Sequence, residues 1–251
     1  MNDNWDYLVN EFHKLGGVAN NVCQKEGERG RGIFPINKNQ ISRIYTPFNL
    51  MVKKDDIFID NGKLRINKDT DYSSDVREFF NYYQDKFSWS GEGKETTVFF
   101  ENGLKLFSLK LKELIKEYIL VDIQNRHKGS WDQIILRRFL EARAFNYKNC
   151  SMICPILELV NYEVISLAFV YGKEGISTPN YPPLSGELTH HYNNSSSIKR
   201  FFSQGFFSKE TIIFSFPFSL KISQKGINLK CKGKEVISDT INIIRDDDNI
   251  I

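Results

Sequence analysis

The hydrophobic pattern of the sequence changes its period twice along the chain. Before Ser73 the apolar residues come in short runs bounded by turn residues, as in Ile57 to Ile66 around Asp60-Asn61-Gly62, a pattern typical of a β-hairpin. From Ser73 to Tyr147 apolar residues recur at helical spacing, and after Asn149 short strand-like runs return. This order predicts a mixed α+β fold in which a helical stretch separates two sets of short strands.

Short strands are expected on both sides of the helical stretch, because brief apolar runs there lie between turn signals. The segment Gly172 to Gly186 contains Pro179, Pro182 and Pro183, and we expect it to be an irregular, exposed loop. A last pair of strands is expected around Gly226. The other expected strands are Gly17 to Val22, one that begins at Ile33, Ile41 to Tyr45, Met152 to Leu157, Val164 to Tyr171 and Thr211 to Ser215.

Two aromatic-rich stripes and one capping signal predict helices in the middle of the chain. Ser130 and Gln133 have the spacing of a capping box, so a helix should begin at about Trp131. Both stripes are interpreted as core, because aromatic residues at helical spacing are more often buried than functional. They consist of Val76, Phe79, Phe80, Tyr83 and Phe87, and of Leu104, Phe107, Leu111, Leu114, Ile115 and Tyr118.

Composition excludes several classes of protein. The 251 residues are 41% apolar with a net charge of +3, which argues against a disordered chain and against a nucleic-acid footprint. No apolar run reaches the length of a membrane span. The first residues, Met1 to Asp6, include acids and no apolar core, so they do not form a signal peptide. We expect a cytoplasmic protein that binds neither nucleic acid nor membrane.

The cysteines and histidines do not predict a metal site. Cys150 and Cys154 are four positions apart, with no second pair to complete a zinc site, and we interpret the cysteines as reduced, buried thiols. Adjacent residues of a strand point to opposite faces, so His190 and His191 cannot chelate one ion from the same side. The remaining cysteines are Cys23 and Cys231.

Gly30 and Gly32 invite comparison with a dinucleotide-binding loop. That motif needs a third glycine where Pro35 stands, and a helix where this sequence predicts a strand. The dinucleotide interpretation therefore fails. A plain turn and a turn that approaches a ligand closely both remain open.

Five short stretches are informative because of their order along the chain. They resemble the motifs of the SET-domain protein methyltransferases, in the branch typified by the Rubisco large-subunit methyltransferase. The resemblance extends from about Gly16 to Leu220. The five stretches are Arg29 to Pro35, Ala142 to Phe145, Pro155 to Tyr162, Glu187 to Asn193 and Gln204 to Phe206.

The resemblance implies a SET fold, in which small curved β-sheets surround a knot-like crossing and a helical insertion splits the domain. The implied parts are an N-terminal SET part at 16–72, the insertion at 73–147, a C-terminal SET part at 148–222, and strands and a tail at 223–251. The large helical substrate-binding domain of that branch does not fit in the residues after Leu220. Substrate recognition is then expected from the insertion, the 172–186 loop and the last strands.

The resemblance also implies S-adenosylmethionine as the cofactor. Asn161-Tyr162 stands in place of the family's Asn-His pair, whose histidine contacts adenine largely through its backbone, and Glu158 replaces the usual aspartate. Arg29 stands where an acidic residue is common. The implied cofactor-binding residues are Arg29, Gly30, Arg31, Arg143, Glu158, Asn161, Tyr162 and Phe206.

Tyr192 takes the place of the family's catalytic tyrosine. Methyl transfer from a sulfonium to an amine is an in-line displacement, so the protein must align a neutral amine with the reacting carbon. A phenol can orient that amine and accept a weak C–H···O contact from the methyl group. With a reference pKa of about 10, it is a poor general base at neutral pH.

The implied substrate is a protein amine, with lysine expected, and Phe145 and Gln204 fall on positions that line the lysine channel. Gln204 stands where the family usually has an aromatic residue. Together with Tyr162 and Arg29, it leaves open a catalytically silent domain that binds a protein partner. An enzyme that methylates histidine or an N-terminal amine also remains open.

Overall fold

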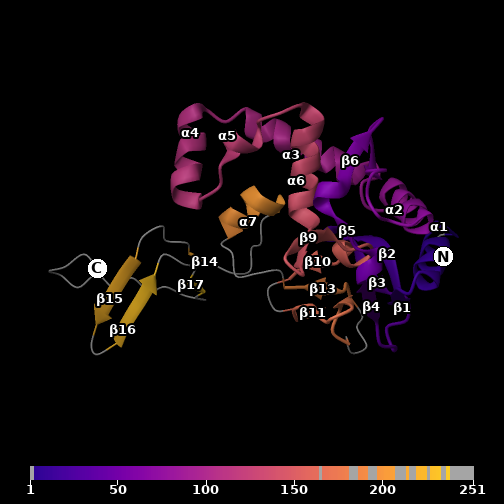
Figure 1. Cartoon of the computed structure of the whole chain (residues 1–251). Coiled ribbons are helices and arrows are strands. Elements are labelled where there is room, and N and C mark those ends of the chain that lie inside the picture. Colours follow the sequence, from indigo (N-terminus) through magenta and orange to yellow (C-terminus); the bar gives the residue numbers. More distant parts are fainter. Residues whose placement is uncertain are drawn as a thin grey trace. The chain divides into compact units, whose positions relative to one another are not determined.

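The computed structural model describes residues 3–163, 166–180, 186–191 and 197–206, and four short strands beyond them. The chain divides into two compact units, which are described separately. The first unit is Met1–Phe99 with Ser130–Tyr192, and the second is Phe100–Gly129 with Asn193–Ile251. Figure 1 shows their elements. The domain boundaries implied by the resemblance remain a prediction.

The first unit opens with a helix that packs along a later one. Helix α1 (Asp3–Lys14) lies beside α2 (Ser74–Lys86), as Figure 1 shows. Its buried residues Trp5, Leu8 and Phe12 lie three to four positions apart and form the inner face of the helix. The ring of Phe12 stacks on Phe79 of α2 at a centroid distance of 5.7 Å.

A four-stranded sheet follows, with the strand order β1-β4-β12-β11 and antiparallel pairing throughout. Its third strand corrects the expectation of an irregular, exposed loop at 172–186. Gly175 and Ile176 are buried, because β12 pairs with the earlier strand β4. The strands are β1 (Val18–Asn20), β4 (Arg43–Pro47), β11 (Val170–Tyr171) and β12 (Gly175–Ser177).

The expected hairpin at Asp60-Asn61-Gly62 is confirmed, and β6 (Ile57–Asp60) pairs with β7 (Lys63–Ile66). Asn61 and Gly62 have φ angles of 48° and 77°. Two successive positive φ angles match the tight turn that suits the twist of a hairpin.

The predicted helix starts are also observed. Ser73 caps α2 by accepting from the amide of Val76. The expected capping box is present at the start of α6 (Trp131–Arg143), where Ser130 and Gln133 exchange side chain to backbone hydrogen bonds. The two short 3₁₀ turns before α2 are η1 (Phe48–Leu50) and η2 (Lys54–Asp56).

The strand expected at Met152 to Leu157 is shorter, because β9 (Cys150–Ile153) ends at Ile153. A 3₁₀ turn, η4 (Leu157–Leu159), follows and leads to the short strand β10 (Asn161–Tyr162). This two-residue strand pairs in parallel with β13 (Thr189–His190). The neighbouring three-stranded sheet contains β5 (Val52–Lys53), β8 (Phe145–Tyr147) and β9 (Cys150–Ile153).

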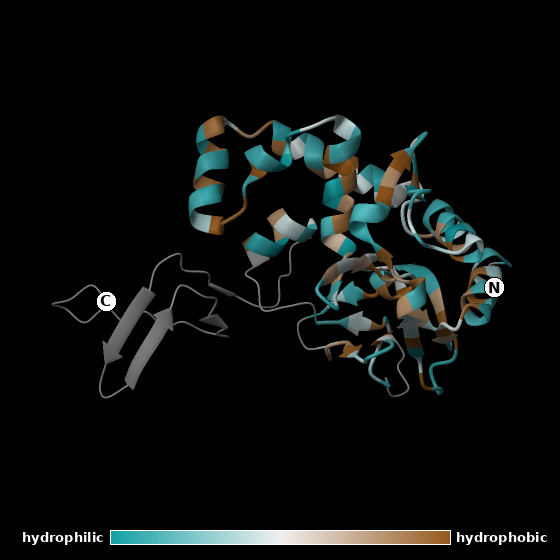
Figure 2. Cartoon of the chain, viewed as in Figure 1, coloured by the Kyte–Doolittle hydropathy of each residue, from teal (hydrophilic) through white to brown (hydrophobic). Residues whose placement is uncertain are grey.

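The core of the first unit consists of two apolar clusters. The larger gathers α1, the small sheets and α2, and it includes Phe12, Ile33 and Tyr83. The second lies around the β6–β7 hairpin and α6, and it includes Leu64 and Phe139. The brown stretches on these elements in Figure 2 are the apolar runs that fill both clusters. The α+β class with small sheets is thereby confirmed.

In the second unit, a smaller cluster holds the described helices together. Leu104, Ile115, Val121, Ile123 and Phe202 are buried in it. The helices are the end of α3 (Glu92–Lys105), α4 (Leu109–Leu114), the π-helical turn η3 (Ile115–Ile119), α5 (Ile123–Arg126) and α7 (Ser197–Gln204).

Part of the second aromatic stripe is not core. Leu111, Leu114 and Tyr118 are 40%, 41% and 51% exposed. The helical stretch breaks at Phe107 and Ser108 and later widens into a π-helical turn, so these residues do not share one inner face with Leu104.

The strand pair expected around Gly226 is confirmed, since β15 (Ser219–Gln224) pairs with β16 (Ile227–Lys232). The strand expected at Thr211 to Ser215 appears as β14 (Ile213–Phe214), which pairs with β17 (Val236–Ile237).

Candidate functional site

The glycine-rich stretch is the turn of a hairpin. Strand β2 (Val22–Gly27) pairs with β3 (Gly30–Pro35), and Arg29 lies in the turn between them. Gly30 has a φ angle of 80°, a left-handed conformation that favours glycine. The backbone conformation of the turn therefore explains the glycine at this position. The strand begins at Gly30 rather than at the expected Ile33.

Asn161 brings a second motif to this hairpin. Its side-chain Nδ2 donates to the backbone oxygen of Arg31 at 3.1 Å and to Oε1 of Glu187 at 2.6 Å. The amide of Leu188 donates to the oxygen of Ile33 at 2.7 Å, which fixes the segment of Glu187 along β3. Three separated stretches of the chain thus meet at Asn161.

Gly32 leaves room for this meeting of side chains. A Cβ atom at Gly32 would lie 1.9 Å from Oε1 of Glu187 and 2.8 Å from Nδ2 of Asn161. The Glu187 carboxylate therefore occupies the space above Gly32. The sequence analysis did not select Glu187 as a site residue, although it begins one of the five stretches.

Arg29 is the cation that faces Glu187. Its Nη1 lies 3.4 Å from Oε2 of Glu187, and its other terminal nitrogen pairs with Glu163. The Arg29 side chain is 37% exposed, whereas that of Glu187 is 6% exposed. The resemblance implies an acidic residue where Arg29 stands. Here the nearby acidic groups come from other segments of the chain.

Glu158 is the centre of a buried polar network. Its side chain is fully buried, and Oε1 accepts from the hydroxyls of Tyr83 at 2.7 Å and Ser88 at 2.6 Å. Oε2 accepts from Nη1 of Arg143 at 3.3 Å. Three donors from distant segments thus stabilise one carboxylate. Burial, and then the Glu158 charge, raise the pKa of Tyr83 well above 10.

Tyr83 and Ser88 are site-supporting residues that the sequence analysis did not identify. Tyr83 was interpreted only as core, and its ring does belong to the core. No local signal distinguishes a core tyrosine whose hydroxyl bonds a carboxylate 75 positions away.

The Arg31 side chain points away from Asn161. Its Nη1 donates to the backbone oxygen of Phe87 at 3.0 Å and to Oγ of Ser90 at 3.1 Å. Phe87 is the C-cap residue of α2, and a guanidinium at that helix end satisfies exposed carbonyl groups. Arg31 therefore offers its backbone to the site and uses its side chain to anchor the hairpin.

Tyr162 and the two histidines pack around the β10–β13 pair. Tyr162 is buried, with its ring 5.8 Å from that of His191. His190 stacks on Phe169 at 3.5 Å, nearly parallel. Burial lowers the pKa of His190 to about 4, so this ring is neutral at physiological pH. The two imidazoles contact different partners, as expected for adjacent strand residues.

The remaining site residues fall in different places. Phe145 is a member of the larger core cluster and packs against Phe169 at 5.5 Å. Tyr192 lies outside the described residues. Gln204 and Phe206 belong to the second unit, where Gln204 ends α7 and Phe206 lies under the guanidinium of Arg200 at 5.8 Å. Gly205 follows the helix with a φ angle of 87°.

The described residues contain neither a cluster of metal-binding side chains nor a helix that could span a membrane. Within the described ranges, no group of three or more His, Cys, Asp or Glu side chains could hold a metal ion. Burial raises the pKa of Cys154 well above 9, and a protonated thiol is a poor metal ligand. None of the helices in the described part of the chain is long and apolar enough to cross a membrane.

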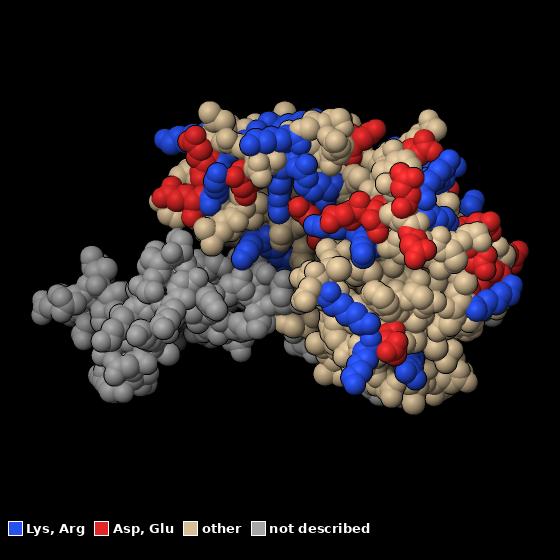
Figure 3. Space-filling view, viewed as in Figure 1, with Lys and Arg blue, Asp and Glu red and all other residues tan. Residues whose placement is uncertain are grey.

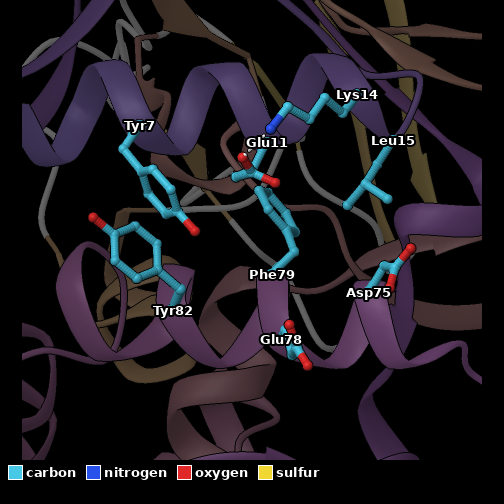
Figure 4. Close-up of a pocket in the computed structure, with 8 residues that line it drawn as sticks. All are labelled: Tyr7, Glu11, Lys14, Leu15, Asp75, Glu78, Phe79 and Tyr82. Atoms are coloured by element: carbon cyan, nitrogen blue, oxygen red, sulfur yellow. Dashed lines mark hydrogen bonds and ion pairs between the residues drawn. The ribbon is translucent and has the colours of Figure 1, made fainter.

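A groove between α1 and α2 contains none of the motif residues. It has a volume of about 240 Å³ and is lined by Tyr7, Glu11, Phe79 and Tyr82, among others. In Figure 4 the rings of Tyr7 and Tyr82 lie next to each other at one end, in an edge-to-face arrangement. Lys14 already pairs with Glu11 at 2.6 Å in this groove. On the face shown in Figure 3, basic and acidic side chains are intermixed.

Comparison with known proteins returned structural matches only. No protein-family model and no curated protein matches the sequence. The solved structures that match include the SET domain of LSMT bound to lysine and AdoHcy, with 14% identity and a TM-score of 0.46 over 95% of this chain and 68% of that one.

Two further matches are Rubisco LSMT bound to AdoMet and Rubisco LSMT bound to sinefungin and monomethyllysine. Their identities are 14% and 13%, and their TM-scores are 0.47 and 0.48. The matches cover 90% and 96% of this chain, and 61% and 68% of those proteins. These proteins belong to the family that the motifs resemble. All three TM-scores are below 0.5.

Proposed function

We propose that this chain is an S-adenosylmethionine-dependent methyltransferase of the SET type that methylates a protein amine, with a lysine side chain as the acceptor. The contact between Asn161 and the β2–β3 hairpin carries the proposal. Nδ2 of Asn161 reaches the backbone oxygen of Arg31 at 3.1 Å, although the two residues are 130 positions apart. A cofactor site between these two motifs requires them to meet in this way.

The groups around this contact suit the amino-acid end of the cofactor, which has an ammonium and a carboxylate. Oδ1 of Asn161 is an acceptor for the ammonium. The guanidinium of Arg143, whose side chain is 27% exposed, would bind the carboxylate while Glu158 orients it. By the resemblance, the backbone of the Arg29 to Arg31 turn and of Tyr162 would contact the rest of the molecule.

The cofactor supplies an activated methyl group on a cationic sulfur. Tyr192 would orient the substrate amine and accept a weak contact from the methyl hydrogens. Its phenol, with a reference pKa of about 10, would remain protonated. A lysine amine enclosed beside a positive charge loses its proton more readily, and that proton would leave to water.

A non-catalytic SET-type domain that binds a protein partner is the second candidate function. One observation favours it: Arg29, in the turn, is paired internally with Glu163 and Glu187. Such internal pairing is what a site without a ligand would need. The two candidates differ in whether the chain binds the cofactor.

Calorimetric titration with S-adenosylmethionine and its demethylated product separates these candidates. The proposal predicts saturable heat with both ligands and a higher melting temperature when each is well above its dissociation constant. Asn161→Ala should weaken binding while the variant remains folded. Neither heat nor a thermal shift for wild type at about millimolar ligand would leave the non-catalytic domain as the function.

Turnover is tested by methyl transfer from labelled cofactor into the proteins of a cell lysate. Tyr192→Phe keeps the ring and should still bind cofactor. It should lower the rate roughly ten- to a thousandfold, or about 1.4 to 4 kcal/mol of barrier, because the hydroxyl acts mainly in the transition state. If Tyr192→Phe labels the same bands at the wild-type rate, Tyr192 is not the catalytic tyrosine.

A further inference from the structure

The hydrogen bonds of Asn161 determine which kind of ligand group it can accept. Both hydrogens of its Nδ2 are used, one by the Arg31 carbonyl and one by Oε1 of Glu187. Among the described residues, none donates to Oδ1 of Asn161. The remaining capacity of this amide is therefore that of an acceptor, and it suits a ligand group that donates.

Glu187 adds acceptor capacity at the same point. A carboxylate offers about four lone-pair positions. The described contacts of Glu187 use one for Asn161 at 2.6 Å and one for Arg29 at the long distance of 3.4 Å. Its side chain is 6% exposed, so a donor that reaches it is poorly screened by water.

The charges around Arg29 also favour a cation. The guanidinium of Arg29 pairs with two carboxylates, Glu163 and Glu187. This group of three therefore has a formal charge of −1. Gly32, directly below the Glu187 carboxylate, has no side chain to cover it. A small cation that lies against Asn161 would neutralise the formal charge of these three side chains.

We propose that Glu187 and Oδ1 of Asn161 together bind the α-ammonium of the cofactor's amino-acid end. The inference rests on the proposed function and names a binding residue for it. The chain should accordingly select ligands with a free α-ammonium.

The test compares two ligands and two variants of the full chain by calorimetry. The ligands are S-adenosylhomocysteine and its desamino analogue, in which hydrogen replaces the α-ammonium. Wild type should prefer S-adenosylhomocysteine. Glu187→Gln keeps the shape but not the charge, and it should weaken S-adenosylhomocysteine binding roughly ten- to a hundredfold. Its affinity for the desamino analogue should be unchanged.

Glu163→Gln is the matched control, because Glu163 pairs with the same Arg29 but has no hydrogen bond to Asn161. It should keep the wild-type preference between the two ligands. Glu187→Asp keeps the charge and should lose less affinity than Glu187→Gln, and melting curves would verify that every variant is folded.

The outcomes separate this inference from the proposed function. If Glu187→Gln has the wild-type preference between the two ligands, Glu187 does not bind the ammonium, although the methyltransferase proposal stands. If Glu163→Gln loses the preference equally, the effect comes from Arg29, and the inference is wrong. If wild type binds neither ligand, the proposed function fails together with it.

Discussion

Glu158 and Glu187 are two buried carboxylates of the first unit with opposite surroundings. Glu158 is fully enclosed and accepts from Tyr83, Ser88 and Arg143. Among the described residues, Glu187 accepts only from Asn161 and, at a longer distance, from Arg29. A carboxylate with all its donors supplied by the protein stabilises the fold. One with fewer donors can bind a ligand.

The difference follows from where the donors come from. The partners of Glu158 lie on α2, just after α2, and at the end of α6, so its network ties three segments to η4. The partners of Glu187 lie on β10 and in a hairpin turn. The helical segments supply three donors to Glu158, whereas the short strand and the turn supply fewer to Glu187.

The largest expected effect is the loss of the charge at Glu158. Glu158→Gln places an amide nitrogen among groups that all donate, so the free energy of unfolding should fall by about 3 kcal/mol. The same change at Glu187 should cost less than about 1 kcal/mol, because Arg29 is partly exposed. Urea unfolding of both variants measures this. Equal losses would contradict the distinction between the two carboxylates.

Acid should lower the stability of the region around Glu187 through His190, which lies on β13. The pKa of His190 falls to about 4 in the folded protein from 6.5. Its contribution is therefore complete above pH 6.5 and is lost as the pH falls towards 4, by at most about 3 kcal/mol. Unfolding experiments at pH 7 and pH 5 should show this loss. In His190→Leu the free energy of unfolding should change less between pH 7 and pH 5. An unchanged pH dependence would show that another group titrates.

Tyr83→Phe tests the polar network around Glu158 with a smaller change. It removes one of three donors while the ring continues to fill the core, so stability should fall by about 1 to 2 kcal/mol. Tyr82→Phe on the same helix is the control. The Tyr82 hydroxyl bonds Asn4 near the surface, and its loss should cost less than about 0.5 kcal/mol. A Tyr83→Phe variant as stable as wild type would mean that its hydroxyl does not support Glu158.

The smallest expected effect is at Gly32. The new methyl group of Gly32→Ala meets only the ends of two side chains, which can move, so the cost should be about 1 kcal/mol. In a Glu187→Ala background this cost should disappear, which a double-mutant cycle would show. Gly103→Ala, on α3 with open space around it, should be neutral or stabilising. An undiminished cost in the Glu187→Ala background would show that Glu187 does not occupy the space above Gly32.

Local patterns predicted the features that depend on neighbouring residues. The turn at Asn61-Gly62 and the capping box at Ser130 are observed because their hydrogen bonds and φ angles involve residues within a few positions. The α+β class followed from the two changes of hydrophobic period.

The predictions that failed needed information from distant segments. The 172–186 segment contains a strand because β4 offers it an edge. The strand expected at Met152 to Leu157 ends at Ile153, and the chain then bends into η4, which presents Glu158 to donors more than 60 positions earlier in the chain. Leu111 and Leu114 are exposed because the helical stretch breaks before them.

The residues of the candidate site also divide into those that the sequence indicated and those that depend on distant segments. Motif order in the sequence identified Asn161, Glu158, Arg143 and the Arg29 to Gly32 turn. It could not identify Glu187, Tyr83 or Ser88, since their roles depend on side chains 26 to 158 positions away. A residue's type and neighbours determine a turn or a cap, because those bonds form within one segment. Whether a carboxylate is enclosed or available is decided only when the chain has folded, because its donors then come from other segments.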